Sequence, residues 1–226
     1  MKPWTVIDRA PAPGGGELVL HQRGEEFAIR VNGRELMSSR QHGSEERMAE
    51  VACEGLSSPK PRVLVGGLGL GYTVRAALER LPPAAQVVVA ELVPAVVAWN
   101  QGVLAPLAGR PLEDVRVKVE TRDVAELLRE ARAHYDAVLL DVDNGPEALT
   151  HEDNRWLYGE RGLTSLQRAL RPRGVVVVWS AGPDAAFSRR LKHAGFDTQV
   201  VEAPARGSRG GSLHTLFIGR VRASGP

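Results

Sequence analysis

The dominant constraint on this chain is a regular alternation, from Arg62 onward, of short apolar runs with segments of helical pattern. The runs are apolar throughout rather than at every second residue, as in RVLVGG at 62–67. Such strands are buried on both faces, which requires a parallel sheet covered by helices on each side. We expect strands at 62–67, 85–92, 115–121, 135–143, 174–181, 198–203 and 213–221. We expect helices at 72–81, 94–104, 124–133, 154–169 and 184–194.

The last two predicted strands have no helix between them, only the sequence PARGSRGGS. They should therefore pair as an antiparallel hairpin. A doubly wound, mostly parallel seven-stranded sheet that ends in such a hairpin is the Rossmann-like α/β pattern of the class I methyltransferase type. This is an expectation about fold, and fold alone does not give an activity.

The segment before Arg62 has a different character. Residues 1–16 end in APAPGGG, which we interpret as a flexible lead-in. Residues 17–58 begin with alternating apolar and polar residues around two turn signals, which predicts a small β-hairpin or meander. Ser44 then opens a segment with one apolar stripe, which predicts a connecting helix. Residues 59–226 would form the Rossmann-like domain that binds a nucleoside cofactor and carries catalysis.

Composition narrows the class of protein. The formal net charge is only +2 over 226 residues and the basic residues are spread along the chain, so we expect no nucleic-acid partner. A single cysteine, Cys53, excludes an internal disulfide, and its neighbours suggest no metal site. The start lacks the apolar core of a signal peptide, and no apolar run approaches the ~18 residues of a membrane span. We expect a soluble, cytoplasmic enzyme or binding domain with no membrane partner.

The glycine-rich turn after the first parallel strand, GGLGLG, carries the strongest functional signal. It could be a phosphate cradle, a nucleoside-binding turn or only a tight corner. A P-loop needs Gly-Lys-Ser/Thr at its end, where Tyr72-Thr73 stand, and the dinucleotide spacing does not fit cleanly. Gly67, Gly69 and Gly71 have the spacing of the G-x-G-x-G turn that holds the amino-acid end of S-adenosylmethionine, with Leu68 between the first two glycines.

Acidic residues follow the next two strands, at the sheet edge where ligands bind in this fold. Glu91 could accept both hydroxyls of a ribose, or it could be a solvated residue at a strand end. Asp123 could cap the following helix, bind the amino group of an adenine, or do both. Acids at these two positions favour a nucleoside over a phosphate, which would want basic or hydroxyl partners.

The fourth strand ends in LLDVDNGP, where two carboxylates and an amide are concentrated. Strand alternation puts Asp141 and Asp143 on the same side, so they could flank one cation or amine. Close carboxylates raise each other's proton affinity, which suits one of them to act as a base. Alternatively, the segment, including Asn144, is a turn with ordinary capping chemistry.

These features resemble the spermidine/spermine synthase family of polyamine aminopropyltransferases, over roughly residues 18–217. The resemblance rests on the N-terminal β-piece, the glycine turn, Glu91 in VAELVP and the segment YDAVLLDVDNGP. It implies a role in polyamine biosynthesis, in which an aminopropyl group moves from decarboxylated S-adenosylmethionine to a small amine. By position it implies that Asp141 is the catalytic aspartate and a cofactor contact, that Asp143 lies near the second carboxylate, and that Glu91 and Asp123 bind ribose and adenine.

The sequence also departs from the family. The family's glycine turn usually carries an aspartate that holds the ammonium of the aminopropyl arm, and Gly69 stands there in this chain. The family's gate-region tyrosine has no clear match, and His42, Glu45 and Glu46 are the polar residues of that region. They are candidate substrate contacts or simply a solvated helix start. Tyr158 and Trp179 could wall the site or belong to the core.

Three functions therefore stay open at this point. The first is an aminopropyltransferase, and the second is a methyltransferase that uses intact S-adenosylmethionine, for which alignment suffices without a base. The third is a non-catalytic nucleoside-binding module. None of them calls for a metal, and a homodimer through the N-terminal β-piece is compatible with all three.

Overall fold

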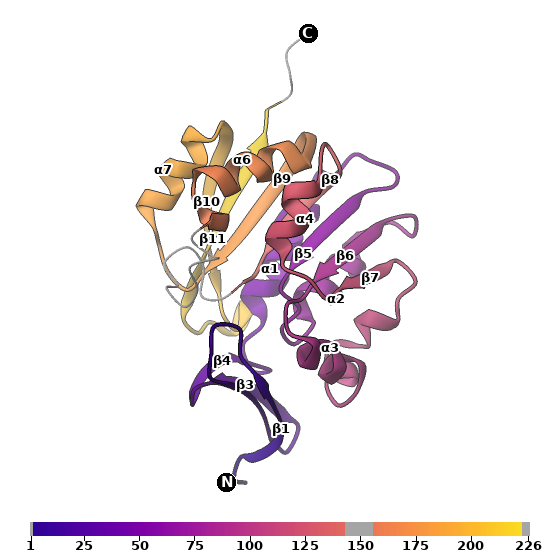
Figure 1. The fold of residues 1–226 in the computed structure, drawn as a ribbon, viewed down its shortest axis with the longest axis vertical. Coiled ribbons are helices and arrows are strands. Elements are labelled where there is room, and N and C mark those ends of the chain that lie inside the picture. The colour runs from indigo at the N-terminus through magenta and orange to yellow at the C-terminus, as the bar shows by residue number, and fades with distance from the viewer. Residues whose placement is uncertain (1, 143–155, 223–226) are drawn as a thin grey trace.

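Two β-sheets organise the protein in the computed structural model, which describes residues 2–142 and 156–222 (Figure 1). The smaller sheet is antiparallel, with its four strands in chain order. These strands are β1 (Thr5–Pro11), β2 (Glu17–Arg23), β3 (Glu26–Val31) and β4 (Arg34–Ser38). Their inward side chains, among them Leu20 and Ile29, are buried in the same hydrophobic cluster as the neighbouring helices. The predicted meander is therefore present and packs on the main body.

The larger sheet has seven strands in the order β10-β11-β9-β8-β5-β6-β7. Its parallel strands are β5 (Arg62–Gly66), β6 (Gln86–Ala90), β7 (Val117–Glu120), β8 (Tyr135–Leu140) and β9 (Leu170–Ser180). The strands β10 (Phe196–Pro204) and β11 (Leu213–Val221) form the expected antiparallel hairpin, and β11 pairs with β9. The chain runs outward from β5 to β7 and then returns to β8, so the strand order reverses beside β5. Ligands bind at this reversal in open α/β sheets.

Helices cover both faces of the larger sheet, as the fully apolar strands require. One face carries α1 (Gly43–Cys53), α2 (Tyr72–Arg80) and α3 (Pro94–Gln101). The other carries α4 (Val124–Glu130), α6 (Glu160–Ala169) and α7 (Ala185–His193). Short 3-10 turns complete the described chain, namely η1 (Ala105–Ala108), η2 (Pro111–Glu113) and η3 (Gly207–Arg209). The doubly wound α/β prediction is confirmed.

The N-terminal stretch corrects one prediction. Residues 1–16 do not form a flexible lead-in, because Thr5–Pro11 is a strand paired along β2. The APAPGGG motif is the turn of this hairpin, closed by a bond from the Ala12 amide to the Gly16 carbonyl at 3.1 Å. The indole of Trp99 on α3 donates to Asp8 at 2.7 Å and ties the strand to the main body. A glycine run that reads as a linker is therefore a hairpin connection.

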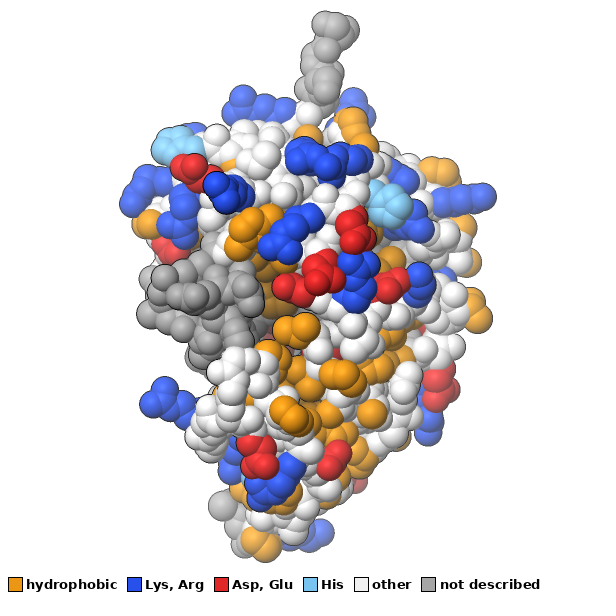
Figure 2. Space-filling model, viewed as in Figure 1, with side chains coloured by type: hydrophobic (Ala, Val, Ile, Leu, Met, Phe, Trp, Pro, Cys, Tyr) orange, Lys and Arg blue, Asp and Glu red, His pale blue; other side chains and the backbone are white. Residues whose placement is uncertain are grey.

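The outer surface has an apolar region and a charged region. Figure 2 shows apolar side chains gathered over the region of α3 and the N-terminal sheet, whereas charged side chains prevail toward the opposite end. Exposed apolar residues include Val6 and Ile7 of β1 and Leu92, which follows β6. None of the helices in residues 2–142 and 156–222 is long and apolar enough to cross a bilayer.

Candidate active site

A cavity of about 390 Å³ lies between the N-terminal sheet and the carboxyl ends of β5, β6, β7 and β8. Its floor comes from the strand ends and holds the glycine turn and three acids. Its opposite wall comes from the N-terminal sheet and is apolar. The polar floor residues are Gly67, Gly69, Glu91, Arg122, Asp123 and Asp141. The sequence-predicted acids after three different strands therefore meet in one enclosed space.

The glycine turn has the backbone that its sequence predicts. Gly67 has a φ of +90°, and a Cβ there would lie 2.2 Å from the carbonyl oxygen of Asp141, so only glycine fits. Gly71 has a φ of +84° and immediately precedes α2. The amide of buried Asn100 donates to the Gly69 carbonyl at 2.8 Å and holds the turn from behind. Gly67 and Gly69 line the cavity, whereas Leu68 and Gly71 shape the turn outside its wall.

Glu91 organises this turn and is itself only 8% exposed. One carboxylate oxygen accepts from the Leu68 amide at 2.9 Å, and the other accepts from the Val93 amide at 2.8 Å. Burial raises the pKa of this carboxyl, and the backbone hydrogen bonds oppose that rise. The residue is therefore not a solvated strand-end glutamate. Its carboxylate faces the cavity in a fixed orientation, as recognition of a ribose would require.

Asp123 has the capping role that the sequence predicts for it, and its position leaves the adenine role open. It is the N-cap of α4, where its carboxylate accepts from the Ala125 amide at 2.8 Å. It also lines the cavity, as Asp141 does from the end of another strand. A carboxylate fixed by a helix end and open to the cavity can accept a hydrogen bond from a ligand amino group.

Asp141 follows β8 at the point of strand-order reversal. Its amide donates to the Gly66 carbonyl at 2.9 Å, which extends the ladder between β5 and β8. Its carboxylate accepts from the hydroxyl of Thr73 on α2 at 3.3 Å. Burial raises the pKa of this carboxyl to about 6, against the effect of the Thr73 bond. A carboxylate that is ionised near neutral pH, and has a raised proton affinity, suits a general base.

The sequence predicts Asp143 and Asn144 as partners of Asp141. Asp143 and Asn144 lie outside the described residues. At the start of α1, burial, together with the charge of Asp141, raises the pKa of Glu45 to about 8. Within the described chain, Glu45 is therefore the acid that interacts with Asp141. Glu45 itself is not part of the cavity wall.

The remaining candidate substrate residues do not line the cavity. His42 stacks on Tyr72 with ring centroids 4.1 Å apart and bonds to Glu46 at 3.0 Å. Glu46 also pairs with Arg75 of α2. The hydroxyl of buried Tyr158 donates to the carbonyl of Val142, a cavity residue, at 3.3 Å. These contacts hold the residues in place and show what each side chain already binds.

Trp179 is also tied to its surroundings rather than to the cavity. Its indole donates to the buried hydroxyl of Ser44 at 3.1 Å, and its ring meets the ring of His214 edge to face. Sequence reasoning missed both Ser44 and His214 as members of this neighbourhood. No local pattern marks them, because Ser44 on α1 and His214 on β11 are 170 residues apart in the chain.

The apolar wall is the largest feature that the sequence did not assign. It consists of Leu18, Ile29, Val31, Leu36 and Met37, with Ala12, Pro13 and Gly14 from the first hairpin turn. A Cβ at Gly69, where φ is +53°, would lie 3.1 Å from the sulfur of Met37. Met37 therefore occupies the space beside the position where the family usually carries an aspartate. The alternation of apolar and polar residues predicted that one face of the N-terminal sheet would be buried. It did not predict that this face would form a wall of the cavity.

A metal-binding cluster was not expected from the sequence. Residues 2–142 and 156–222 contain no group of three or more His, Cys, Asp or Glu side chains arranged to hold an ion.

Two curated proteins are similar in sequence to this chain. Polyamine aminopropyltransferase 1 of Streptomyces coelicolor is 33% identical over 165 residues, which are 69% of this chain and 30% of that protein. The polyamine aminopropyltransferase of Mycobacterium tuberculosis is 30% identical over 212 residues, which are 88% of this chain and 39% of that protein. The chain thus spans about a third of the length of these two relatives.

Solved structures share the fold. Spermidine synthase from Thermotoga maritima superposes with a TM-score of 0.77 at 16% identity, over 97% of this chain and 74% of that one. A spermidine synthase in complex with the transition-state analogue AdoDATO gives 0.76 at 16% identity, over 97% and 73%. The family model for the spermine/spermidine synthase domain matches residues 41–185, well over half of this chain. The chain therefore belongs to the spermine/spermidine synthase domain family.

Proposed function

We propose that this protein transfers an aminopropyl group from decarboxylated S-adenosylmethionine to a small amine of the polyamine type. The observation that carries the proposal is the position of Asp141, a half-buried carboxylate with a raised pKa on the floor of a cavity beside a glycine turn. Family membership and the names of the curated relatives support the same reaction.

The nucleoside would occupy the half of the cavity above β5, β6 and β7. Glu91 would accept the ribose hydroxyls with the carboxylate lone pairs that its backbone bonds leave free. Asp123 would accept the adenine amino group, and the backbone of Gly67 and Gly69 would face the sulfonium arm. Val93 and Val96 would pack on the base, because both line this end of the cavity. The apolar sheet wall would exclude water from the reacting centre.

The acceptor amine must lose a proton before it can react, because an alkylammonium nitrogen has no free lone pair. Asp141 takes that proton. The nitrogen lone pair then forms a bond to the carbon next to the sulfonium sulfur, the carbon–sulfur bond breaks, and sulfur keeps the electron pair. Positive charge moves from sulfur to nitrogen, and the nucleoside leaves as a neutral thioether. Asp141 thus supplies general base catalysis, and the cavity supplies alignment.

Product analysis tests the proposal directly. The protein is incubated with decarboxylated or intact S-adenosylmethionine and a panel of di- and polyamines, and the nucleoside product is identified by mass spectrometry. We expect methylthioadenosine, formed only when decarboxylated cosubstrate and an amine are both present. Formation of S-adenosylhomocysteine would instead support methyl transfer. Nucleoside binding without turnover of either form would contradict both enzymatic functions.

Three further expectations accompany this function. A homodimer through the N-terminal sheet is testable by light scattering, and residence in the cytoplasm is testable by fractionation of the source cells. The division at residues 58 and 59 into a β-piece and a catalytic domain also stays a prediction. Expression of residues 59–226 alone would test it, because that fragment lacks the apolar wall of the cavity.

A further inference from the structure

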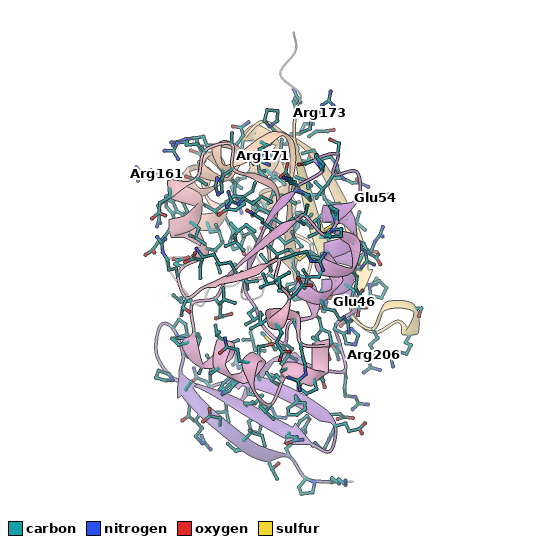
Figure 3. The ribbon with its side chains drawn as sticks, turned by 90° about the vertical axis from the view of Figure 1, so that its right-hand side faces the viewer. Glu46, Glu54, Arg161, Arg171, Arg173 and Arg206 are labelled. Carbon is teal, nitrogen blue, oxygen red and sulfur yellow. The ribbon has the colours of Figure 1, made fainter. Side chains whose placement is uncertain are left out.

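The edge of the larger sheet opposite the cavity carries basic side chains. The cavity lies at the carboxyl ends of β5 and β8, so the amino ends of these strands and of β9 form the far edge. Arg62 begins β5, and Arg171 and Arg173 lie at the start of β9. Figure 3 shows Arg171 and Arg173 at the end of the molecule opposite to the N-terminal sheet. These arginines are therefore remote from the candidate active site.

The start of β9 bulges out of the sheet. Along the ladder between β8 and β9, a single residue of β8, Asp136, faces residues 171–174 of β9. Arg173 in this bulge has a φ of +66°, and Ala133, which precedes β8, has a φ of +41°. Residues other than glycine rarely adopt this left-handed conformation, and both bulges and such strained residues are frequent at functional sites. The backbone here departs from a regular ladder at the point where two arginines stand.

One carboxylate connects the strands at this edge. Oδ2 of Asp136 accepts from the backbone amide of Arg62 at 2.7 Å and from Nη1 of Arg171 at 2.7 Å. Nε of Arg171 also donates to the Ala133 carbonyl at 3.4 Å. The hydrogen bonds to Asp136 thus bring the start of β5 and the bulge of β9 to the same oxygen atom. Arg62 and Arg171 share the neighbourhood of a single acid.

The positive charge of this edge exceeds what Asp136 can neutralise. Nε of Arg62 is buried and has no hydrogen-bond partner among the described residues, which is rare for a buried donor in a folded protein. Along the five adjacent strands from β5 to β10, the other acid at this edge of the described chain is Asp197, the second residue of β10. The same edge and the helix ends beside it carry further cations that form no ion pair with the described residues, namely Lys60, Arg168, Lys192, Arg220 and Arg222.

We propose that Arg62, Arg171 and Arg173 form a binding site for an oligophosphate, meaning the linked phosphate groups of inorganic polyphosphate or of a nucleotide. Arginine suits this ligand because its planar guanidinium can donate two parallel hydrogen bonds to one phosphate. β5 and β9 are separated by β8, a distance of about 10 Å between their backbones. A chain of linked phosphates therefore fits the site better than a single phosphate. The site does not depend on the proposed function.

Isothermal titration calorimetry of the full chain with sodium tripolyphosphate tests the site. We expect saturable binding that weakens as ionic strength rises, because salt screens exposed charges. The double variant Arg62→Gln, Arg171→Gln should weaken binding by roughly tenfold or more, since it removes two charge-assisted contacts. Arg173→Gln, which removes no ion pair of the described chain, should weaken it by a smaller factor. The matched control is Arg34→Gln on the N-terminal sheet, where the side chain is exposed, and it should leave the affinity unchanged.

Asp136→Asn supplies a change of opposite sign. One oxygen of Asp136 accepts both hydrogen bonds, so the carbonyl oxygen of an asparagine can accept them while the negative charge is lost. We expect this variant to bind tripolyphosphate several-fold more tightly than the wild type. Thermal melts of every variant show whether it is folded. If Asp136→Asn is folded and gains no affinity, the anion does not bind beside Asp136 and the site is overturned.

ATP and a DNA duplex are the comparison ligands. Binding of ATP that Arg62→Gln, Arg171→Gln weakens would support the site and identify its ligand as a nucleotide. Binding of tripolyphosphate without such an effect on ATP would support the site and identify its ligand as inorganic polyphosphate. Absence of saturable tripolyphosphate binding, or an equal loss in Arg34→Gln, would overturn the proposal. Binding of the duplex without binding of tripolyphosphate would overturn it as well.

Discussion

The two halves of the cavity treat their acids in different ways. In the half above β6 and β7, Glu91 and Asp123 accept hydrogen bonds from backbone amides. In the half above β8, Asp141 accepts from the side-chain hydroxyl of Thr73, and Glu45, outside the cavity wall, accepts from that of Ser44. Backbone amides are held in place by the fold, so they fix the orientation of the carboxylates that they bind. Under the proposed function, we expect the first half to recognise the nucleoside and the second half to exchange a proton.

The largest expected effect comes from a substitution in the half of the cavity above β8. Asp141→Asn keeps the shape of the side chain but removes the base, so we expect kcat to fall by about 10²–10⁴-fold, the usual contribution of a general base. Because the nucleoside half does not depend on this charge, affinity for the nucleoside should change by only a few-fold. Steady-state kinetics and calorimetric titration measure the two quantities. Retained turnover would show that another group removes the proton.

The glycine turn offers a paired test of the recognition half. Gly67→Ala would put a methyl group against the backbone carbonyl of Asp141 at 2.2 Å, in a residue with a φ of +90°. Gly69→Ala meets only the flexible end of Met37 at 3.1 Å. We expect Gly67→Ala to lower the free energy of unfolding by several kcal/mol, and Gly69→Ala by about 1–2 kcal/mol, the cost of a left-handed residue. Denaturant unfolding of both variants measures the difference, and equal losses would contradict the geometry.

Glu91→Gln tests the fixed acid of the recognition half. Both carboxylate oxygens accept hydrogen bonds from backbone amides, so the NH2 group of a glutamine here would face a backbone N–H, which is also a donor. We expect a loss of about 1–3 kcal/mol in stability, together with weaker nucleoside binding. Glu79→Gln on the exposed side of α2 is the matched control, because its carboxylate only pairs with arginines at the surface. Should Glu91→Gln bind the nucleoside as tightly as the control, Glu91 would be a purely structural residue.

The contrast also explains how much of the site could be predicted from sequence. Asp141, Glu91 and Asp123 each follow a strand closely, and the parallel topology brings strand ends together, so strand order alone placed them. Ser44, Trp179 and His214 meet through contacts across up to 170 residues, and no spacing encodes such contacts. The lead-in was misread because a glycine run has the same composition in a linker as in a hairpin turn. Met37 was missed because the alternation of apolar and polar residues predicts that a side chain is buried, but not that it lines a cavity.

A further expected effect concerns the dependence of stability on pH. The pKa values of Asp141 and Glu45 are raised in the folded protein, so the folded state binds protons more tightly than the unfolded state. Stability should therefore be greatest below their unfolded values and fall as pH rises through about 6 to about 8. A pKa that folding raises by one pH unit changes the free energy of unfolding by about 1.4 kcal/mol, and partial solvent access reduces this.

The Glu45→Gln variant should flatten that decline, because it cannot ionise, whereas Glu50→Gln should not. The pKa of Glu50 is lowered by the arginines beside it, so its contribution to stability is lost only as pH falls into the acid range. This control therefore leaves the slope between about pH 6 and pH 8 unchanged, although it lowers stability by a constant amount there. Urea unfolding at a series of pH values measures the slopes. Parallel slopes for wild type and Glu45→Gln would mean that Glu45 is ionised throughout. Asp141 and Glu45 would then carry two permanent charges at neutral pH.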